Sequence, residues 1–499
     1  MTEPSYIVIQ AGGKGTRLKH HTMNKPKAIV SVENLPIIFH LFRKYPNKKY
    51  IIIGDYKKDV LDRYLETFCD VQYLTVGVDG NEGTCAGIKN ALEIIPSNEK
   101  FLLIWSDLIL GNTYKMPVDD YNYIGLSGTF SCRWKYEDGT FEEERSDTNG
   151  VAGFFIFEDK SVIRTVPESG EFVKWLKGAG INFKETLLKG AEYGLVETIK
   201  PLEGGKCRPF NAMTEVDGKL IKRGIDDQGR KLAEREIAWY RHVEGMDVPT
   251  PKIYSYCPLT MEIIDGKNIF EYYEVSDNEK RTILHYIVEG LNNLHQYDKT
   301  FPDRYSIQKA YYTKTVDRLQ KVRNLIPFAN EEYITINGRK CKNIFFELDE
   351  MRERVSKLPC FEFCLIHGDC TFSNMLLRND KKPVFIDPRG YFGDSELVGD
   401  PLYDWAKLYY SLYGDYDQFN LGRFELKILE NNVELRIETN GWKNLEDEFI
   451  AQLPANISID DVRFIHAIIW LSLTTYAWND YDSVCGAFYN GLYHMEGLL

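Results

Sequence analysis

The stretch IQAGGKGTRLKHHTMNKPKA, residues 9–28, follows a short run of β-forming residues at the start of the chain. Three glycines, Gly12, Gly13 and Gly15, fall within four positions and are followed by several basic residues. Glycine lets backbone N–H groups approach an anion closely, and basic side chains neutralise its charge. The stretch therefore predicts a phosphate-binding loop at the end of a strand.

Two familiar phosphate-binding loops do not fit this spacing. A Walker A loop needs a Ser or Thr directly after its lysine, but Lys14 is followed by Gly15. A dinucleotide-binding loop needs a third glycine where this chain has Leu18. The sequence thus disfavours both nucleotide hydrolysis of the Walker type and hydride transfer.

The residues around this loop alternate short β-rich runs with amphipathic stretches between residues 5 and 110. This rhythm predicts a mostly parallel sheet covered by helices, in which ligands bind at the carboxyl ends of the strands. The opening loop and the segment WSD, residues 105–107, both follow predicted strands. We expect them to face the same ligand.

Length and composition bound the remaining possibilities. A chain of 499 residues, 43% of them hydrophobic, predicts two or more folded domains. A net charge of −13 argues against a general binder of nucleic acids or anionic membranes. No signal-like or membrane-spanning segment is predicted, and the 10 cysteines show no zinc-binding spacing, so a cytoplasmic location with reduced thiols is expected.

A second unit is predicted after the first α/β region. Short strands and a helix at 171–182 complete the first unit, which we place at residues 1–198. The pair Asp217–Gly218 is a strong hairpin signal. The second unit, 199–499, then has a small sheet lobe at 199–266 and a largely helical lobe at 267–499.

The order AGGKGTRL, NKPKA, EGTCAG (82–87) and WSD resembles the signature of nucleotidyltransferases that make sugar nucleotides and CDP-alcohols. The resemblance implies a Rossmann-like mixed sheet and attack of a phosphorylated acceptor on the α-phosphate of an NTP. It implies that Arg17 holds the leaving phosphates and that Lys27 stabilises the α-phosphate. It also implies Mg²⁺ at Asp107 and the use of CTP or UTP. The implied nucleotide-binding residues are Gly12, Gly13, Gly15, Gly83 and Thr84.

The residue at one metal-binding position differs from the family signature, and the role of a lysine in the opening loop is left open. The resemblance implies a second metal carboxylate, and EYGLVE (192–197) supplies Glu192 at the place where the family carries an aspartate. Lys25 fits a solvated loop lysine as well as a phosphate contact. His20 and His21 are expected to be solvated.

The segments HGDCTFSN (367–374) and FIDPRG (385–390) resemble the catalytic and metal-binding segments of the aminoglycoside phosphotransferase and choline kinase superfamily. That superfamily shares the protein-kinase architecture. The resemblance implies that Asp369 accepts the proton of a substrate hydroxyl, and that Asn374 and Asp387 hold Mg²⁺. It also implies that His367 and Asp404 support the catalytic loop.

The small lobe is expected to bind ATP. Gly204 and Gly205 would cover its phosphates, and MEIIDG (261–266) resembles the hinge that contacts adenine. Lys222 fits the phosphate-binding strand lysine and Glu236 fits its helix partner. The neighbouring residues Lys219 and Glu234 are the alternatives.

Aromatic residues gather in the C-terminal helices, where they form either packed core or a surface for a choline or sugar ligand. They are Trp405, Tyr409, Tyr410, Trp470, Tyr476 and Trp478.

Together the two signatures predict a bifunctional enzyme. One part would phosphorylate a sugar or an amino alcohol such as choline with ATP, and the other would couple that phosphate to an NMP, releasing pyrophosphate. The product would be an activated precursor for surface polysaccharide, made from small molecules without nucleic acid or membrane partners. The sequence leaves open whether the enzyme is a homo-oligomer. The alternatives are an antibiotic-type phosphotransferase fused to a nucleotidyltransferase, and a nucleotide-sensing scaffold with one inactive domain.

Overall fold

The computed structural model describes residues 3–193, 211–224, 227–272 and 275–499. Its backbone divides into two compact units. The first comprises residues 1–204 and also Trp478–Asp482, and the second comprises Gly205–Ala477 and Ser483–Leu499. Each unit is described by itself.

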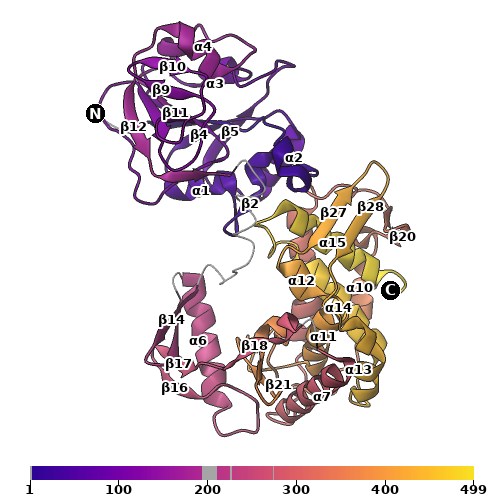
Figure 1. The fold of residues 1–499 in the computed structure, drawn as a ribbon. Helices are drawn as coiled ribbons and strands as arrows, with labels where there is room; N and C mark the ends of the chain where they lie inside the picture. The colour runs from indigo at the N-terminus through magenta and orange to yellow at the C-terminus, as the bar shows by residue number, and fades with distance from the viewer. Residues whose placement is uncertain (1–2, 194–210, 225–226, 273–274) are drawn as a thin grey trace. The chain divides into compact units, whose positions relative to one another are not determined.

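The first unit is built on a sheet of nine strands, which Figure 1 shows in indigo to magenta. Its centre is parallel, because β1 pairs in the same direction with β4 on one side and β6 on the other. Strand β11 then joins β6 antiparallel, so the sheet is mixed. The strands are β1 (Tyr6–Gln10), β4 (Lys49–Ile53), β5 (Gln72–Val76), β6 (Phe101–Trp105), β8 (Tyr123–Ser127), β9 (Lys135–Glu137), β10 (Thr140–Glu142), β11 (Gly150–Phe157) and β12 (Lys184–Leu188).

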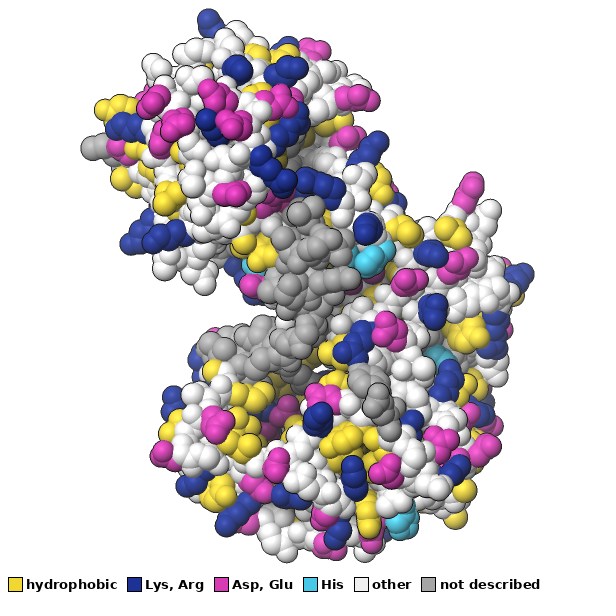
Figure 2. Space-filling model, in the orientation of Figure 1, with side chains coloured by type: hydrophobic (Ala, Val, Ile, Leu, Met, Phe, Trp, Pro, Cys, Tyr) yellow, Lys and Arg dark blue, Asp and Glu magenta, His cyan; other side chains and the backbone are white. Residues whose placement is uncertain are grey.

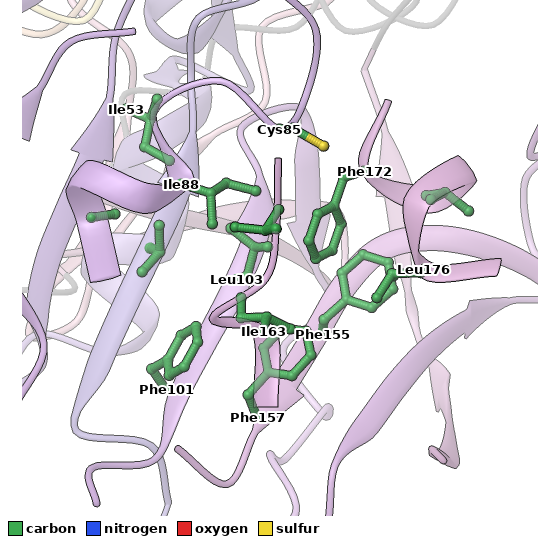
Figure 3. Close-up of a cluster of buried hydrophobic side chains, with 14 of the residues drawn as sticks. Ile53, Cys85, Ile88, Phe101, Leu103, Phe155, Phe157, Ile163, Phe172 and Leu176 are labelled. Carbon is green, nitrogen blue, oxygen red and sulfur yellow. The ribbon is translucent and has the colours of Figure 1, made fainter. Parts of the chain in front are cut away.

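Helices cover both faces of this sheet. Alternate residues of β4 point to opposite faces. Ile51 and Ile53 join the apolar cluster with helices α3 and α4 (Figure 3), whereas Tyr50 contacts Phe42 of α1 on the other face. The helices are α1 (Ile37–Lys44), α2 (Lys58–Phe68), α3 (Ile88–Ile94) and α4 (Phe172–Ala179). The predicted α/β layering is confirmed, and the helix predicted at 171–182 is present but shorter.

Short elements surround the opening loop. Strand β13 (Gly190–Glu192) pairs with β7 (Leu108–Leu110) just beyond the end of β6. The loop itself continues into short helical turns and a two-stranded ribbon. These elements are η1 (Thr16–Thr22), η2 (Lys27–Ile29), β2 (Ser31–Val32) and β3 (Leu35–Pro36).

The second unit begins with a four-stranded antiparallel sheet. The predicted hairpin joins its first two strands, and Asp217 and Gly218 adopt the positive φ angles of 51° and 67° that such a tight turn requires. Helix α6 (Asp227–His242) packs on this sheet. The strands are β14 (Asn211–Val216), β15 (Lys219–Gly224), β16 (Ile253–Tyr256) and β17 (Leu259–Glu262).

The rest of the second unit is mainly helical, as predicted. A small sheet consists of β18 (Gly266–Asn268), β22 (Met375–Arg378) and β23 (Pro383–Phe385), and its last two strands link the segments HGDCTFSN and FIDPRG along the chain. The main helices are α7 (Asp277–Leu294), α9 (Lys314–Val322), α10 (Leu348–Ser356), α11 (Pro401–Leu412), α13 (Glu446–Gln452), α14 (Ile459–Leu473) and α15 (Tyr481–Met495). Shorter elements are α8 (Arg304–Ile307), α12 (Tyr416–Asn420), β19 (Tyr333–Ile336), β20 (Arg339–Lys342), β27 (Phe424–Ile428) and β28 (Val433–Ile437).

Most of the aromatic residues of the C-terminal helices belong to this helical core. Trp405, Tyr409, Tyr410 and Trp470 are almost fully buried, and Tyr410 packs edge-on against Trp470. Among the predicted aromatic residues that belong to the second unit, only Tyr476 is exposed. The structure thus favours the core interpretation for these four side chains.

Basic and acidic side chains are interspersed on the face of each unit seen in Figure 2. None of the described helices has the length and apolar character required to cross a membrane.

Candidate functional site

The first candidate site lies at the carboxyl ends of β1 and β6. The opening loop leaves β1 after Gln10, and glycine is required at two of its positions. A Cβ on Gly12 would lie 2.9 Å from Asp55 Cβ. Gly15 has φ +59°, and a Cβ there would lie 3.2 Å from Lys27 Cβ. A Cβ on Gly13 would meet nothing within 4 Å, so this glycine faces open space.

Asp107 and Lys27 form an ion pair at these strand ends. The pairing of β13 with β7 brings Glu192 beside them, and Tyr193 N donates to Asp107 O at 2.9 Å. Burial, and then the neighbouring Asp107 carboxylate, raise the pKa of Glu192 above its ordinary value, while Lys27 and Arg17 oppose the rise. Two carboxylates, a lysine and an arginine therefore gather at one point.

The EGTCAG segment lies against the same strand end. Gln10 Nε2 donates to Thr84 O at 2.9 Å, which joins β1 to this segment. Gly83 has φ +88°, and a Cβ there would lie 2.3 Å from Gly170 O. The Thr84 hydroxyl accepts a hydrogen bond from Phe172 N at 2.7 Å, at the start of α4. The sequence reasoning missed Gln10, which its place at the strand end could have indicated.

Lys25 is neither solvated nor aimed at a phosphate. Its side chain is buried and its Nζ lies 2.5 Å from Asp480 Oδ1 and 2.7 Å from Asp482 Oδ2, in the first unit's segment Trp478–Asp482. Burial alone would lower the pKa of Lys25, but the two aspartates raise it well above its ordinary value. Lys25 thus anchors the loop, while His20 is exposed, as expected.

The second candidate site is centred on Asp369. Its carboxylate is almost fully buried and contacts Lys407 Nζ at 3.0 Å and Arg389 Nε at 3.2 Å. Asn374 Nδ2 donates to Asp369 O at 2.9 Å, which fixes the loop between them. The sequence reasoning placed Asp369 and Asn374 in this site but assigned no role to Arg389 or Lys407.

Asp404 shapes the backbone of this loop. Its carboxylate accepts hydrogen bonds from His367 N at 2.9 Å and Gly368 N at 2.7 Å, and it lies 3.1 Å from His295 Nε2. Burial raises the pKa of Asp404, but His295 and the other donors together hold it below the ordinary value. The His367 ring packs inside the site, with Nε2 3.0 Å from Ile386 O, and burial lowers its pKa.

The strand lysine and its helix partner meet as the sequence indicated. Lys222 on β15 is buried and lies 2.8 Å from Glu236 Oε2 on α6, and it also pairs with Asp387. Burial lowers the pKa of Lys222, but Asp387 and Glu236 together raise it. The alternatives Lys219 and Glu234 are both exposed. Gly204 and Gly205 lie outside the described residues.

The residues present fit magnesium at both sites. Burial, and then the nearby Asp107 carboxylate, disfavour the charged form of Glu192 and raise its pKa, and a divalent cation bound beside both carboxylates would favour that charged form. In the second site Asp387 and the amide oxygen of Asn374 are hard oxygen donors of the type that Mg²⁺ prefers. Among the described residues no three His, Cys, Asp or Glu side chains converge in a metal-binding group.

Comparison with known proteins matches two separate regions of the chain to two families. Residues 6–138 match the family described as Nucleotidyl transferase, and residues 198–425 match the Phosphotransferase enzyme family. The chain therefore contains one region that is similar to each family, and the phosphotransferase match implies a kinase-like fold for the second region.

Individual relatives match the N-terminal part. The Bifunctional protein GlmU of Methanococcus maripaludis is 25% identical over 225 residues, which cover 44% of this chain and 47% of that protein. Glucose-1-phosphate cytidylyltransferase of Salmonella typhimurium is 27% identical over 151 residues, covering 25% of this chain and 59% of its own. The chain thus spans about half the length of these curated relatives. Among solved structures, HddC from Yersinia pseudotuberculosis is 21% identical, with a TM-score of 0.34 over 40% of this chain and 97% of its own.

Proposed function

We propose that this protein is a bifunctional enzyme that carries out two consecutive reactions. Its phosphotransferase domain, residues 199–499, transfers the γ-phosphoryl group of ATP to a hydroxyl of a small molecule. Its nucleotidyltransferase domain, residues 1–198, then joins that phosphate to an NMP and releases pyrophosphate. The observation that carries the proposal is that two separate clusters of acid and base side chains, around Asp107 and around Asp369, each occur in a region that matches a transferase family.

In the first reaction, Asp369 is placed to receive the proton of the acceptor hydroxyl as its oxygen attacks the γ-phosphorus. The bond between the γ-phosphorus and the bridging oxygen breaks, and ADP leaves. Lys222, which pairs with Glu236, would contact the ATP phosphates. Asn374 and Asp387 would hold Mg²⁺, which neutralises phosphate charge when bound.

In the second reaction, an oxygen of the acceptor phosphate attacks the α-phosphorus of an NTP, and the bond to the pyrophosphate oxygen breaks. The acceptor phosphate is ionised near neutral pH, since its second pKa is about 6, so no protein base is needed. Lys27 stabilises charge that develops at the α-phosphate, and Arg17 holds the leaving phosphates. Asp107 and Glu192 would hold Mg²⁺ there. The relative named glucose-1-phosphate cytidylyltransferase supports a sugar phosphate and CTP as substrates.

The product of both steps is an NDP-activated small molecule of the kind consumed in surface polysaccharide synthesis. The polysaccharide role, the choice of CTP or UTP, and a cytoplasmic location are part of this proposal.

A single assay tests the order of the reactions. The protein is incubated with Mg²⁺, ATP, each of CTP, UTP, GTP and dTTP, and pools of hydroxyl compounds, while ADP and pyrophosphate are measured separately. We expect pyrophosphate release to depend on ATP when the acceptor carries no phosphate, and to become independent of ATP when the phosphorylated acceptor is supplied. Pyrophosphate release from an unphosphorylated acceptor without ATP would contradict the proposal.

A further inference from the structure

The phosphotransferase site holds a group of basic side chains that the proposed reaction does not require. These side chains come from three separate segments of the chain. Two of the side chains lie on consecutive turns of α9. We name this group the basic cluster. Its members are Lys314, Arg318, Arg389 and Lys407.

The basic cluster extends from the Asp369 carboxylate towards α9. Arg389 and Lys407 contact Asp369 directly, at 3.2 Å and 3.0 Å. Lys314 and Arg318 lie close enough that their charges, with those of Arg389 and Lys407, act on one another. The site of phosphoryl transfer is therefore strongly positive on the side that these residues form.

The positive charge of this cluster is only partly neutralised. Arg318 donates to Ser472 O at 2.7 Å and to Ser472 Oγ at 3.0 Å, which are both uncharged acceptors. Within the described part of the chain, no carboxylate lies at ion-pair distance from Lys314 or Arg318. Among these cations, Asp369 contacts Arg389 and Lys407, and its charge also acts on Lys314.

Grouping these cations in a largely buried place is costly without an anion. Burial, and then the neighbouring Arg318, Arg389 and Lys407, lower the pKa of Lys314 to about 7. Charges in such an environment repel more strongly than in water. An anionic ligand group bound there would restore the charge on Lys314 and offset the repulsion.

Tyrosine rings already pair with these cations. Lys314 Nζ lies 5.6 Å from the Tyr403 ring centroid and Lys407 Nζ lies 5.4 Å from that of Tyr410. The guanidinium groups of Arg318 and Arg389 each lie 5.7 Å from the ring centroid of Tyr476. The ring faces that would recognise a quaternary ammonium are therefore engaged by protein cations.

From this arrangement we infer that the phosphoryl acceptor is an anionic hydroxyl compound, whose carboxylate or phosphate group binds the basic cluster while its hydroxyl reaches Asp369. This inference rests on the proposed function, because it names the substrate class of the same site. It favours sugar acids, hydroxy acids and sugar phosphates over choline, neutral sugars and polycationic antibiotics.

Acceptor pools of defined charge test this inference. ADP release from ATP is measured with gluconate and glucuronate, with glucose 6-phosphate and glycerol 3-phosphate, with glucose and glycerol, and with choline and kanamycin. We expect one of the two anionic pools to be phosphorylated most efficiently, and the comparison of those two pools distinguishes carboxylate from phosphate recognition. A higher kcat/KM for a neutral or cationic compound would overturn the inference.

Substitutions in the basic cluster add a site-specific readout. For the best anionic acceptor, Lys314→Gln and Arg318→Gln should each raise the acceptor KM about 10- to 100-fold while leaving the KM for ATP unchanged. Arg318→Lys should restore part of the affinity, and Lys309→Gln, at an exposed lysine paired with Asp394, should match the wild type. A rise in the KM for ATP in place of the acceptor KM would show that the cluster serves the nucleotide, and would overturn the inference.

Binding without catalysis separates this inference from the proposed function. Calorimetric titration of the full chain with each anionic compound, without ATP, should show binding that Lys314→Gln weakens about tenfold or more. If anions bind in this way but no compound yields ADP, the phosphotransferase proposal fails and the anion site stands. If no anion binds to a protein that does phosphorylate an acceptor, the inference fails and the phosphotransferase proposal stands.

Discussion

The two candidate sites place their aspartates in different surroundings. Asp107 forms one partly buried pair with Lys27 at the carboxyl ends of two central strands, beside a glycine loop and a second carboxylate, Glu192. Asp369 lies in a buried network with Arg389 and Lys407, on a loop whose backbone Asp404 holds. The difference matches the chemistry proposed for each site. Nucleotidyl transfer starts from an ionised phosphate and needs only charge stabilisation, whereas phosphorylation of a hydroxyl needs a positioned proton acceptor.

The largest expected effect comes from removing the proton acceptor. Asp369→Asn keeps the shape of the side chain but cannot accept the hydroxyl proton, so ADP release should fall about 100- to 10,000-fold. Pyrophosphate release from a pre-phosphorylated acceptor should stay at the wild-type rate. Coupled assays for the two products make this measurement. Equal loss of both activities in a folded variant would show that the two sites are not independent.

Removing the buried anchor of the opening loop should cost stability. Lys25→Met removes the buried cation that the partly buried Asp480 and Asp482 share, which should lower the free energy of unfolding by about 3–5 kcal/mol. Lys58→Met, which breaks the more exposed pair with Asp62, should cost about 1 kcal/mol or less. Urea denaturation followed by tryptophan fluorescence compares the two variants. Equal losses would mean that the Lys25 pair is no more important than a surface pair.

Lys27 should contribute to nucleotidyl transfer through its positive charge alone. Lys27→Met removes the cation proposed at the α-phosphate and should slow pyrophosphate release about 100- to 1,000-fold, with ADP release unchanged. Lys49→Met, at an exposed lysine of the same sheet, provides the control. A rate within about threefold of wild type would remove Lys27 from the proposed mechanism.

The smallest effect is expected in the pH dependence of stability. Asp400 caps α11, which carries Asp404 and Lys407, and it accepts hydrogen bonds from Leu402 N and the Tyr311 hydroxyl. Burial raises the pKa of Asp400 from 3.8 to about 6. The folded state therefore retains this proton at a pH where the unfolded state has lost it, so stability from this group is complete below pH 4 and falls as the pH rises to 6.

Asp400→Asn keeps a capping side chain without this titration. Between pH 4 and pH 6 the unfolding free energy of the wild type should decrease by up to about 3 kcal/mol through this group. The variant should not show this decrease. Denaturant titrations of both proteins across that range check the prediction. Parallel pH profiles would show that Asp400 is not protonated in the folded protein.

Much of this fold could be predicted because its signals are local. The β-rich runs and amphipathic stretches before residue 110 correspond closely to the strands and helices of the first sheet, and the Asp217–Gly218 hairpin follows from turn geometry. Motif spacing likewise indicated Lys222 and Glu236, which lie in contact. Spacing was informative there because neighbouring elements fix the distance between these residues.

The remaining features depend on contacts between residues far apart in the chain. Nothing in the local sequence shows that Lys25 pairs with residues more than 450 positions away. Lys314 and Arg318 lie on a helix without any motif, and only folding brings them towards Asp369. Arg389 lies in the quoted segment FIDPRG, and Lys407 lies three residues after the predicted Asp404; this proximity was the available signal.

The position of Trp478–Asp482 affects how the chain can be divided. The chain enters the second unit after Gly204, returns to the first at Trp478, and leaves it again after Asp482. A single cut therefore cannot yield the first unit intact. A fragment that ends at Gly204 would expose the Lys25 site without Asp480 and Asp482, and we expect it to need either those residues grafted on or a substitution of Lys25 to fold well.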